Sequence, residues 1–421
     1  MVEVWLPYGD TEICLTIPPE NLLDIVEPRN LPGPPENISE EIGKALKNPL
    51  GLPALRDIVK PGHKISIVID KNLLSGIGNI IISQIYEELK NCGTENSNIS
   101  IFVGDILGEK VEDDVRRFFP NIPDDVYIKP HNPYIEDNLA KIGLTSSKTS
   151  IHIDKNFLNS DIKILVGKIG LHSYAGFSGG RQTILAVSGI KTIQQNYALS
   201  LNYSAKVGFL DKNPVHLDLS EIVKMCKVNF IFDVVEADSK PLKIFHGKVD
   251  DAFYGGVNYV KSLFEFPIKD KADIAVVSVG GYPNDKTFYD AQEFFQSVSN
   301  VVKEFGVIIF AVECSQGFGD KNLYRWMFEA KDVKELKNIA RKEFIKGLHK
   351  IFQLKALTEK FRIIIVSALP SLLTSEIFKF KVADSVDDAL EMAFRMAGRK
   401  SKVAVFPDIS KVLPFLPPTI K

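Results

Sequence analysis

Cysteine is scarce in this 421-residue chain, and the four that occur stand far apart, at Cys14, Cys92, Cys226 and Cys314. Because no C-x-x-C pair is present, the sequence excludes a zinc ribbon and a disulfide framework and fits a reducing cytoplasm. An excess of one charge is also missing, since 51 Lys and Arg face 53 Asp and Glu, for a net charge of −2. This balance argues against a nucleic-acid partner or an anionic membrane surface as partner.

Long apolar runs are lacking too. The longest, such as GVIIFAV at 306–312, are too short to span a bilayer. The first ten residues, MVEVWLPYGD, lack the basic segment and apolar core of a signal peptide. No two histidines have the HxxxH spacing of metal ligands on one helix face, so we expect no such metal site. These absences predict a cytoplasmic protein with no membrane partner, and they leave its oligomeric state open.

What is present is an alternation of short β-branched runs with stretches of helical spacing, typical of parallel sheets covered by helices. The expected strands of one series lie at 64–70, 98–104, 125–130 and 161–167, and those of a second at 272–281, 306–314, 362–369 and 402–407. This pattern predicts two α/β domains with mostly parallel sheets, an N-terminal one over 1–266 and a C-terminal one over 267–405. A tail over 406–421 could return to the N-terminal domain. We expect the active-site cleft between the two domains.

Several local features complete this outline. Residues 2–17 predict a hairpin with a Gly-Asp turn, and 229–249 predict an antiparallel pair. Ser39 is expected to cap a helix. Further helices are expected at 77–93, 111–120, 250–264 and 291–306.

The strongest local signal is LHSYAGFSGGRQTILAVSG, at 171–189. Backbone N–H groups of a glycine-rich turn can form a nest for oxygens, and the following helix adds positive potential. Arg181 could hold a carboxylate or phosphate through two bonds. His172 could exchange protons with the same ligand near neutrality. The turn residues of this anion seat are Gly176, Ser178, Gly179 and Gly180. The sequence leaves open an alternative, a plain glycine-rich turn with a surface Arg and a structural His.

Other candidates carry weaker signals. Asp70 ends a predicted strand, where ligands of parallel sheets bind. Tyr289 follows a strand within GGYPNDKTFYDAQ, where a turn alone explains the glycines. His349 and Lys350, in GLHKIF, lie on an expected helix, and a solvated lysine is the simpler interpretation. His131 lies between prolines in KPHNP, which favours a structural histidine.

At this point the motifs resemble a known family. GLHSYAGFSGGRQTIL, GGYPND…Y, ECSQGFGDKNLYRWM, GLHK and VDDAL…A are similar in order and spacing to the nickel-dependent lactate racemases, the LarA-like proteins. The resemblance implies two α/β domains with the active site between them and a nickel-pincer nucleotide as cofactor. It also implies a lysine that tethers the cofactor, a histidine that ligates nickel, and two histidines that act as bases on the substrate hydroxyl while the cofactor takes a hydride.

Residue by residue, the resemblance is partial. His172 matches one base, and Arg181 is also kept. Gln182 stands where the tethering lysine is expected, Tyr197 where the nickel ligand is expected, and Ile106 where the second base is expected. A carboxamide cannot form the covalent link, and a phenol is a poor nickel ligand at neutral pH.

The remaining motifs diverge in the same direction. Asp70 survives in the D-x-T-R-P motif, but Leu73 takes its arginine position. Tyr289 is kept, whereas Asp290 and Glu293 replace a glutamine and a lysine of the family. Together these changes argue against a covalently attached nickel-pincer nucleotide. A nucleotide bound without a covalent link stays open, and no metal-ligating residue is predicted.

The first functional hypothesis is a divergent racemase or epimerase that acts on a small hydroxy acid or polyol, with His172 as its acid and base. The second is a non-catalytic sensor or partner subunit that binds an anionic metabolite or nucleotide. A third is a vestigial cleft whose glycine-rich turn survives because the backbone needs it. In the first two, the ligand is a small anion.

Overall fold

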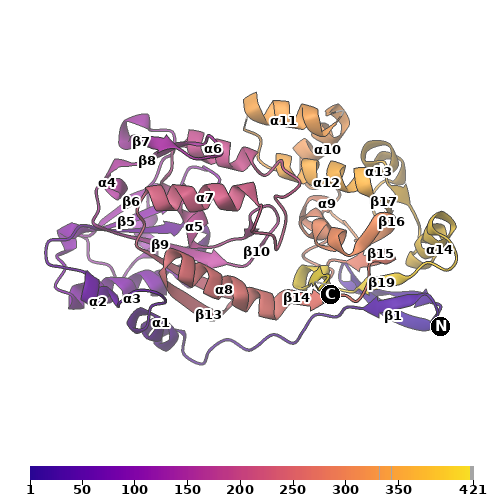
Figure 1. Ribbon diagram of the computed structural model, residues 1–421, viewed down its shortest axis with the longest axis horizontal. Coiled ribbons are helices and arrows are strands. Elements are labelled where there is room, and N and C mark those ends of the chain that lie inside the picture. Colours follow the sequence, from indigo (N-terminus) through magenta and orange to yellow (C-terminus); the bar gives the residue numbers. More distant parts are fainter. Residues whose placement is uncertain (331, 343, 418–421) are drawn as a thin grey trace. The chain divides into compact units, whose positions relative to one another are not determined.

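The computed structural model describes residues 1–417 apart from 331 and 343. The chain divides into two compact units, drawn in Figure 1. The first is the N-terminal unit, Leu31–Val260. The second is the C-terminal unit, which combines Met1–Asn30 with Lys261–Lys421. Both are α/β units with mostly parallel sheets, as the sequence predicts.

The N-terminal unit is built on a six-stranded sheet with the order β13-β12-β9-β4-β5-β6. Only the β12–β13 pair is antiparallel. The strands are β4 (Ile65–Asp70), β5 (Ile99–Gly104), β6 (Tyr127–Pro130), β9 (Ile162–Ile169), β12 (Phe230–Ala237) and β13 (Lys240–Lys248). Every residue of β4 is buried, as expected for a strand covered on both faces. This arrangement brings the carboxyl ends of β4, β5, β9 and β12 to one edge of the sheet.

Helices and two short ladders surround this sheet. The helices are α1 (Ile38–Lys47), α2 (Leu55–Ile58), α3 (Gly78–Asn91), α4 (Lys155–Leu158), α5 (Gly180–Thr183), α6 (Ile190–Ala198), α7 (Pro214–Met225) and α8 (Val249–Phe264). The ladders are β7 (Leu139–Leu144) with β8 (Ser150–Asp154), and β10 (Leu171–His172) with β11 (Gly176–Phe177). The core on one face joins the apolar side chains of α1 and α3 to those of β4, β5 and β9.

Two local predictions in this unit are wrong. Asn37, not Ser39, caps α1, because its side chain accepts a hydrogen bond from the Glu40 amide at 3.3 Å. The helix expected over 111–120 is only a 3-10 turn, Val115–Phe118. The Arg116 guanidinium there donates to the carbonyls of Pro123 and Val126, which are loop contacts that helical spacing does not reveal.

The C-terminal unit contains a second six-stranded sheet, with the order β18-β17-β16-β15-β19-β3 and all pairs parallel. Its strands are β3 (Leu22–Ile25), β15 (Ala272–Ser278), β16 (Val302–Ala311), β17 (Arg362–Val366), β18 (Lys381–Val382) and β19 (Val403–Phe406). Its helices are α9 (Phe288–Ala291), α10 (Lys321–Glu329), α11 (Val333–Lys342), α12 (Leu348–Lys360), α13 (Ser371–Phe378) and α14 (Val386–Ala397). Instead of the single helix expected over 291–306, a 3-10 helix follows α9 to Asn300 and β16 then begins.

The grouping of the chain ends differs from the predicted domains. The predicted hairpin forms as β1 (Val2–Tyr8) and β2 (Thr11–Ile17), and its Leu6 and Leu15 enter the core of the C-terminal unit. The next strand, β3, pairs with β19. At the other end, β20 (Leu413–Phe415) pairs with β14 (Glu265–Pro267) inside the same unit. The β3–β19 pair joins residues almost a whole chain apart, so no local sequence pattern predicts it.

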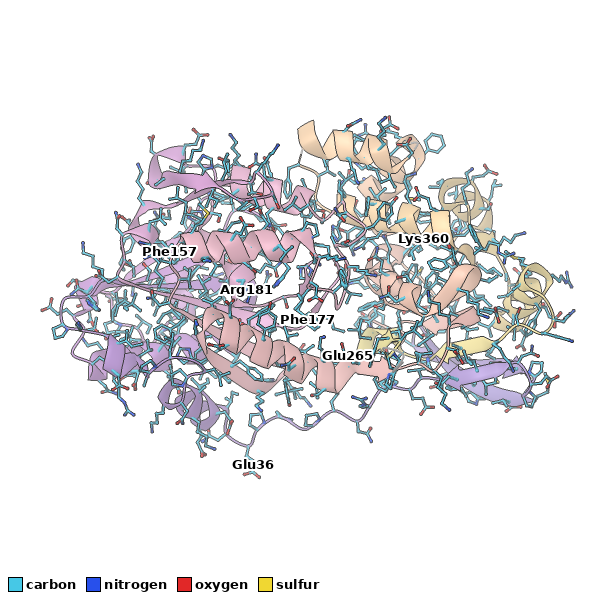
Figure 2. The ribbon with its side chains drawn as sticks, in the orientation of Figure 1. Glu36, Phe157, Phe177, Arg181, Glu265 and Lys360 are labelled. Atoms are coloured by element: carbon cyan, nitrogen blue, oxygen red, sulfur yellow. The ribbon has the colours of Figure 1, made fainter. Side chains whose placement is uncertain are left out.

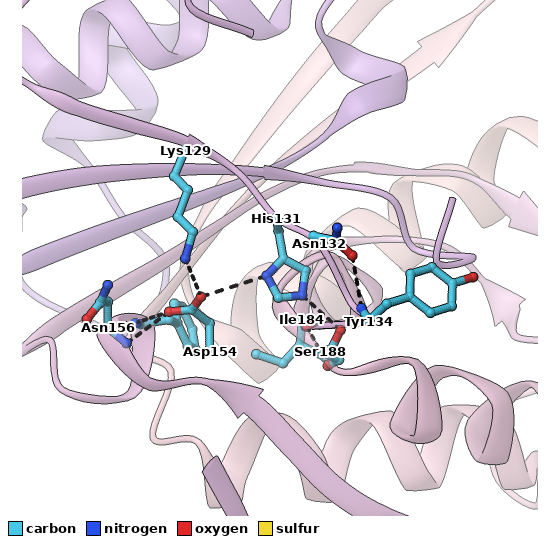
Figure 3. A network of polar contacts seen from close by, with 9 residues as sticks. Lys129, His131, Asn132, Tyr134, Asp154, Asn156, Ile184 and Ser188 are labelled. Atoms are coloured by element: carbon cyan, nitrogen blue, oxygen red, sulfur yellow. Dashed lines mark hydrogen bonds and ion pairs between the residues drawn. The ribbon is translucent and has the colours of Figure 1, made fainter. Parts of the chain in front are cut away.

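His131 has the structural role that its proline-flanked turn suggests (Figure 3). Its Nε2 lies 2.9 Å from the Ser188 carbonyl oxygen, and its Nδ1 lies 3.8 Å from the Asp154 carboxylate. Lys129 donates to the same carboxylate at 3.1 Å. Burial alone would raise the pKa of Asp154, but the contacts with His131 and Lys129 lower it overall. The network ties the ends of β6 and β8 to the residue that follows the 184–187 turn.

Replacing Asp154 should therefore weaken the N-terminal unit in a pH-dependent way. A carboxylate with a lowered pKa stabilises the fold above its unfolded value and loses this contribution as pH falls. We expect Asp154→Asn to cost about 1–3 kcal/mol of unfolding free energy at pH 7 and clearly less at pH 2.5, measured by urea unfolding. The exposed Asp137→Asn serves as control. Equal losses at both pH values would contradict the ionic role.

Candidate functional site

A pocket of about 200 Å³ lies beyond the carboxyl ends of β4 and β9 in the N-terminal unit, and we call it the His172 pocket. Its lining residues are Asp70, Asn72, Leu73, Ile106, Gly167, Lys168, His172, Ser178, Gly179, Gln182 and Thr183. This is the edge where ligands of parallel sheets bind. Of the predicted site residues, Asp70, His172, Ser178 and Gly179 meet here. Gly176 and Gly180 do not line the pocket.

The glycine-rich turn lies directly against β12. Gly179 has φ +140°, a conformation that L side chains rarely adopt. A Cβ on Gly179 would lie 3.2 Å from the Asp233 carboxylate, and one on Gly180 would lie 2.7 Å from Ile231. The Ser178 amide donates to the Gly170 carbonyl at 3.0 Å. The glycines thus serve close packing of the backbone, and one amide of the expected nest is already used.

The His172 ring is oriented by its own turn. The Tyr174 and Ala175 amides donate to its Nδ1, at 3.4 and 3.2 Å. Because Nδ1 then uses its lone pair, the proton of the neutral ring lies on Nε2. The Tyr174 ring packs edge-on at 4.4 Å between centroids. The ring therefore presents an Nε2–H donor at the pocket wall.

Gln182 lies beside this donor, with its side-chain amide 3.2 Å from Nε2 of His172. The amide of a glutamine can turn its oxygen toward such a donor, so the two side chains form a matched pair. Tyr197 does not line the pocket. It packs behind His172 through Tyr174, whose ring centroid is 5.8 Å from its own.

The structure corrects the role expected of Arg181, which points away from the His172 pocket and lies between α7 and α8 (Figure 2). Its guanidinium donates to Asp250 at 2.5 Å and to Ser220 at 2.8 Å, and it stacks over the Phe253 ring at 4.2 Å. Burial and the Arg181 charge lower the pKa of His216 to about 4, so this ring is neutral beside the guanidinium. Arg181 is thus part of the packing of the unit rather than a contact of this pocket.

Two charged side chains do line the pocket. Burial raises the pKa of Asp70 to about 6, although hydrogen bonds from Asn72 lower it in part. Lys168, which the sequence reasoning overlooked, pairs with Glu236 at 2.6 Å. It lies near the end of β9, directly after the expected strand, and this position is the signal that could have identified it.

The remaining predicted residues gather in the C-terminal unit. Lys350 is buried rather than solvated. Its Nζ donates to the Tyr289 carbonyl at 2.7 Å, lies 3.0 Å from Glu293 and sits 3.8 Å from the centre of the Tyr289 ring. Burial, with nearby carboxylates, raises the pKa of Tyr289 to about 12. His349 precedes Lys350 in the first turn of α12 and is also buried.

Comparison with known proteins decides the family. Residues 8–208 match the lactate racemase N-terminal domain, and residues 268–413 match the lactate racemase C-terminal domain. The chain belongs to the lactate racemase family. It is 27% identical over 420 residues to a lactate racemase of Thermoanaerobacterium thermosaccharolyticum, covering 97% of this chain and 98% of that protein. It is 28% identical, with the same coverage, to a lactate racemase of Lactiplantibacillus plantarum.

Solved structures agree with this assignment. The lactate racemase apoprotein of T. thermosaccharolyticum superimposes with a TM-score of 0.82 at 25% identity, over 98% of this chain and all of that one. A protein from Thermotoga maritima shares the fold, with a TM-score of 0.55 at 16% identity, over 92% of this chain and all of that one. Among the described helices, none has the length and apolar character needed to cross a membrane.

The pocket contains three of the positions that the resemblance singles out. Leu73, Ile106 and Gln182 stand where an arginine, a base and the tethering lysine are expected, and all three line the pocket with His172. Gln182 offers a carboxamide and no amine at the tether position. The residues present therefore do not fit covalent attachment of the nickel-pincer nucleotide at this position.

Asp233, a second residue that sequence reasoning missed, lies fully buried beneath the glycine-rich turn. Neither of its oxygens has a hydrogen-bond partner of normal geometry among the described groups. Burial raises the pKa of Asp233 to about 7, although the Gly180 amide and the Arg181 charge oppose this. A lone acid within the apolar run FIFDVV is the sequence signal that marks it.

This raised pKa predicts a loss of stability as pH rises. The folded chain holds the Asp233 proton up to about pH 7, whereas the unfolded chain releases it near pH 4, so the contribution is lost between these values. Asp233→Asn has no such proton. The quantity to follow is the unfolding free energy of Asp233→Asn minus that of the original chain. We expect this difference to rise by about 2–4 kcal/mol between pH 4.5 and pH 8. Urea unfolding would measure this, with exposed Asp211→Asn as control. A difference independent of pH would disprove the buried ionisation.

Proposed function

We propose that this chain is an isomerase-type enzyme that acts on a small hydroxy acid, with His172 as the residue that handles the hydroxyl proton. Membership of the lactate racemase family supports the substrate class. The observation that carries the proposal is the His172 ring itself, which two backbone amides orient at the wall of the pocket. A fixed imidazole beside a small pocket is suited to proton exchange with a bound oxygen.

The geometry also sets a condition on this chemistry. To accept a proton at Nε2, the ring must carry one on Nδ1, where the Tyr174 and Ala175 amides now donate. Proton acceptance therefore requires a local rearrangement of the 172–175 turn or of the ring. In the arrangement described, His172 is a hydrogen-bond donor to a ligand oxygen.

That same observation favours a second candidate function, a binding protein for a small hydroxy acid or related anion without turnover. In it, neutral His172 donates Nε2–H to the ligand and needs no proton exchange. Gln182 supports this candidate, because its side-chain amide can form a hydrogen bond with the neutral His172 ring. Binding of a ligand would replace or share that contact.

Turnover and affinity together test both candidates. The purified chain is given D-lactate and L-lactate, and interconversion is followed by chiral chromatography while affinity is measured by calorimetry. If His172 handles the proton, His172→Gln should lower turnover at least 100-fold and change affinity only a few-fold, because glutamine keeps an N–H donor. If the chain only binds, no turnover occurs and His172→Ala should weaken affinity about two- to tenfold.

The outcomes separate the candidates. Turnover that survives in His172→Gln contradicts the catalytic role of His172. Binding without turnover supports the second candidate and contradicts the first. The half-buried His63→Gln variant is the matched control for both measurements, since His63 does not line the pocket.

A further inference from the structure

We propose that Lys168 binds the carboxylate of the ligand in the His172 pocket and that Glu236 sets the strength of this contact. The inference rests on the proposed function, because it assumes a small hydroxy acid as ligand. It identifies the anion-binding group of the site, which sequence reasoning assigned to Arg181.

The pocket offers a single permanent cation. Among the eleven residues that line it in the described part of the chain, Lys168 is the only lysine or arginine. It follows Gly167 on β9, and Ser178, Gly179 and His172 line the same pocket. A ligand that donates or accepts at His172 is therefore in a small cavity whose lining includes Lys168.

Two of the other expected anion contacts, the Arg181 guanidinium and the Ser178 amide, are already used. Arg181 is paired with Asp250 and packed on Phe253, outside the pocket. The Ser178 amide donates to the Gly170 carbonyl, and the Gly180 amide faces the buried Asp233 carboxyl. A carboxylate in the pocket consequently needs a side-chain cation, and Lys168 provides it.

The pair with Glu236 leaves Lys168 able to bind an anion. An ammonium has three N–H donors, and the 2.6 Å contact with Glu236 uses one of them. The Lys168 side chain is 49% exposed, whereas that of Glu236 is only 14% exposed. Glu236 thus holds the amine in place at the rim, and its negative charge reduces the attraction for a second carboxylate.

Two anions that differ only in a hydroxyl test this assignment. Propionate and L-lactate share the carboxylate, and affinity for each is measured by calorimetry at low salt. Lys168→Met should weaken both about tenfold, because both lose the charge-assisted bond. Lys168→Arg should stay within about threefold of the original chain. Glu236→Gln should strengthen both about threefold, because glutamine still accepts from the amine but carries no charge.

Controls distinguish this inference from the proposed function. The exposed Lys240→Met changes the net charge equally and should leave both affinities unchanged. His172→Phe should weaken lactate but not propionate, because only lactate carries the hydroxyl. Unchanged affinities in Lys168→Met overturn the Lys168 assignment while leaving the role of His172 standing. Binding of neither anion by the original chain overturns both.

Discussion

The close approach of the 178–180 turn to β12 is the constraint on which the site depends. A Cβ on Gly167, Gly179 or Gly180 would lie between 2.7 and 3.2 Å from Asp233 or Ile231, so the backbone can lie this deep only without side chains. Helix α5 starts directly from this buried turn, and its residues therefore point in fixed directions. Gln182 faces His172, while Arg181 faces α7 and α8. The packing of this turn on β12 thus directs Gln182 to the pocket and Arg181 to the core between α7 and α8.

Much of the fold could be predicted from the sequence, because parallel strands buried on both faces appear as short β-branched, apolar runs. The β-branched runs at 64–70 and 98–104 became β4 and β5, and the antiparallel pair at 229–249 became β12 and β13. The grouping of the first 30 residues could not be predicted. Strand β3 contributes four half-buried residues, and its pairing with β19 depends on contacts some 380 residues away, which composition and periodicity do not encode.

The sequence predicted four residues that line the His172 pocket, but it did not predict their contacts. Glycines and a histidine at a strand end located the pocket, because ligands bind at that edge of a parallel sheet. The sequence could not reveal that Arg181 turns into the packing of α7 and α8, since residues next to each other on a helix point about 100° apart and either direction fits the motif. Lys168 escaped notice for the opposite reason, because a lysine on a strand is most often a solvated one.

The residue at position 182 determines the charge beside His172. An ammonium beside His172 would disfavour a protonated imidazole and would bring a cation to α5. A carboxamide at this position is neutral, and it pairs with the ring through one hydrogen bond. Apolar Leu73 and Ile106 line the same wall, so the positive charge that remains is on β9, at Lys168. An anionic ligand would then approach His172 from the side of β9, with its carboxylate at the rim and its hydroxyl toward the ring.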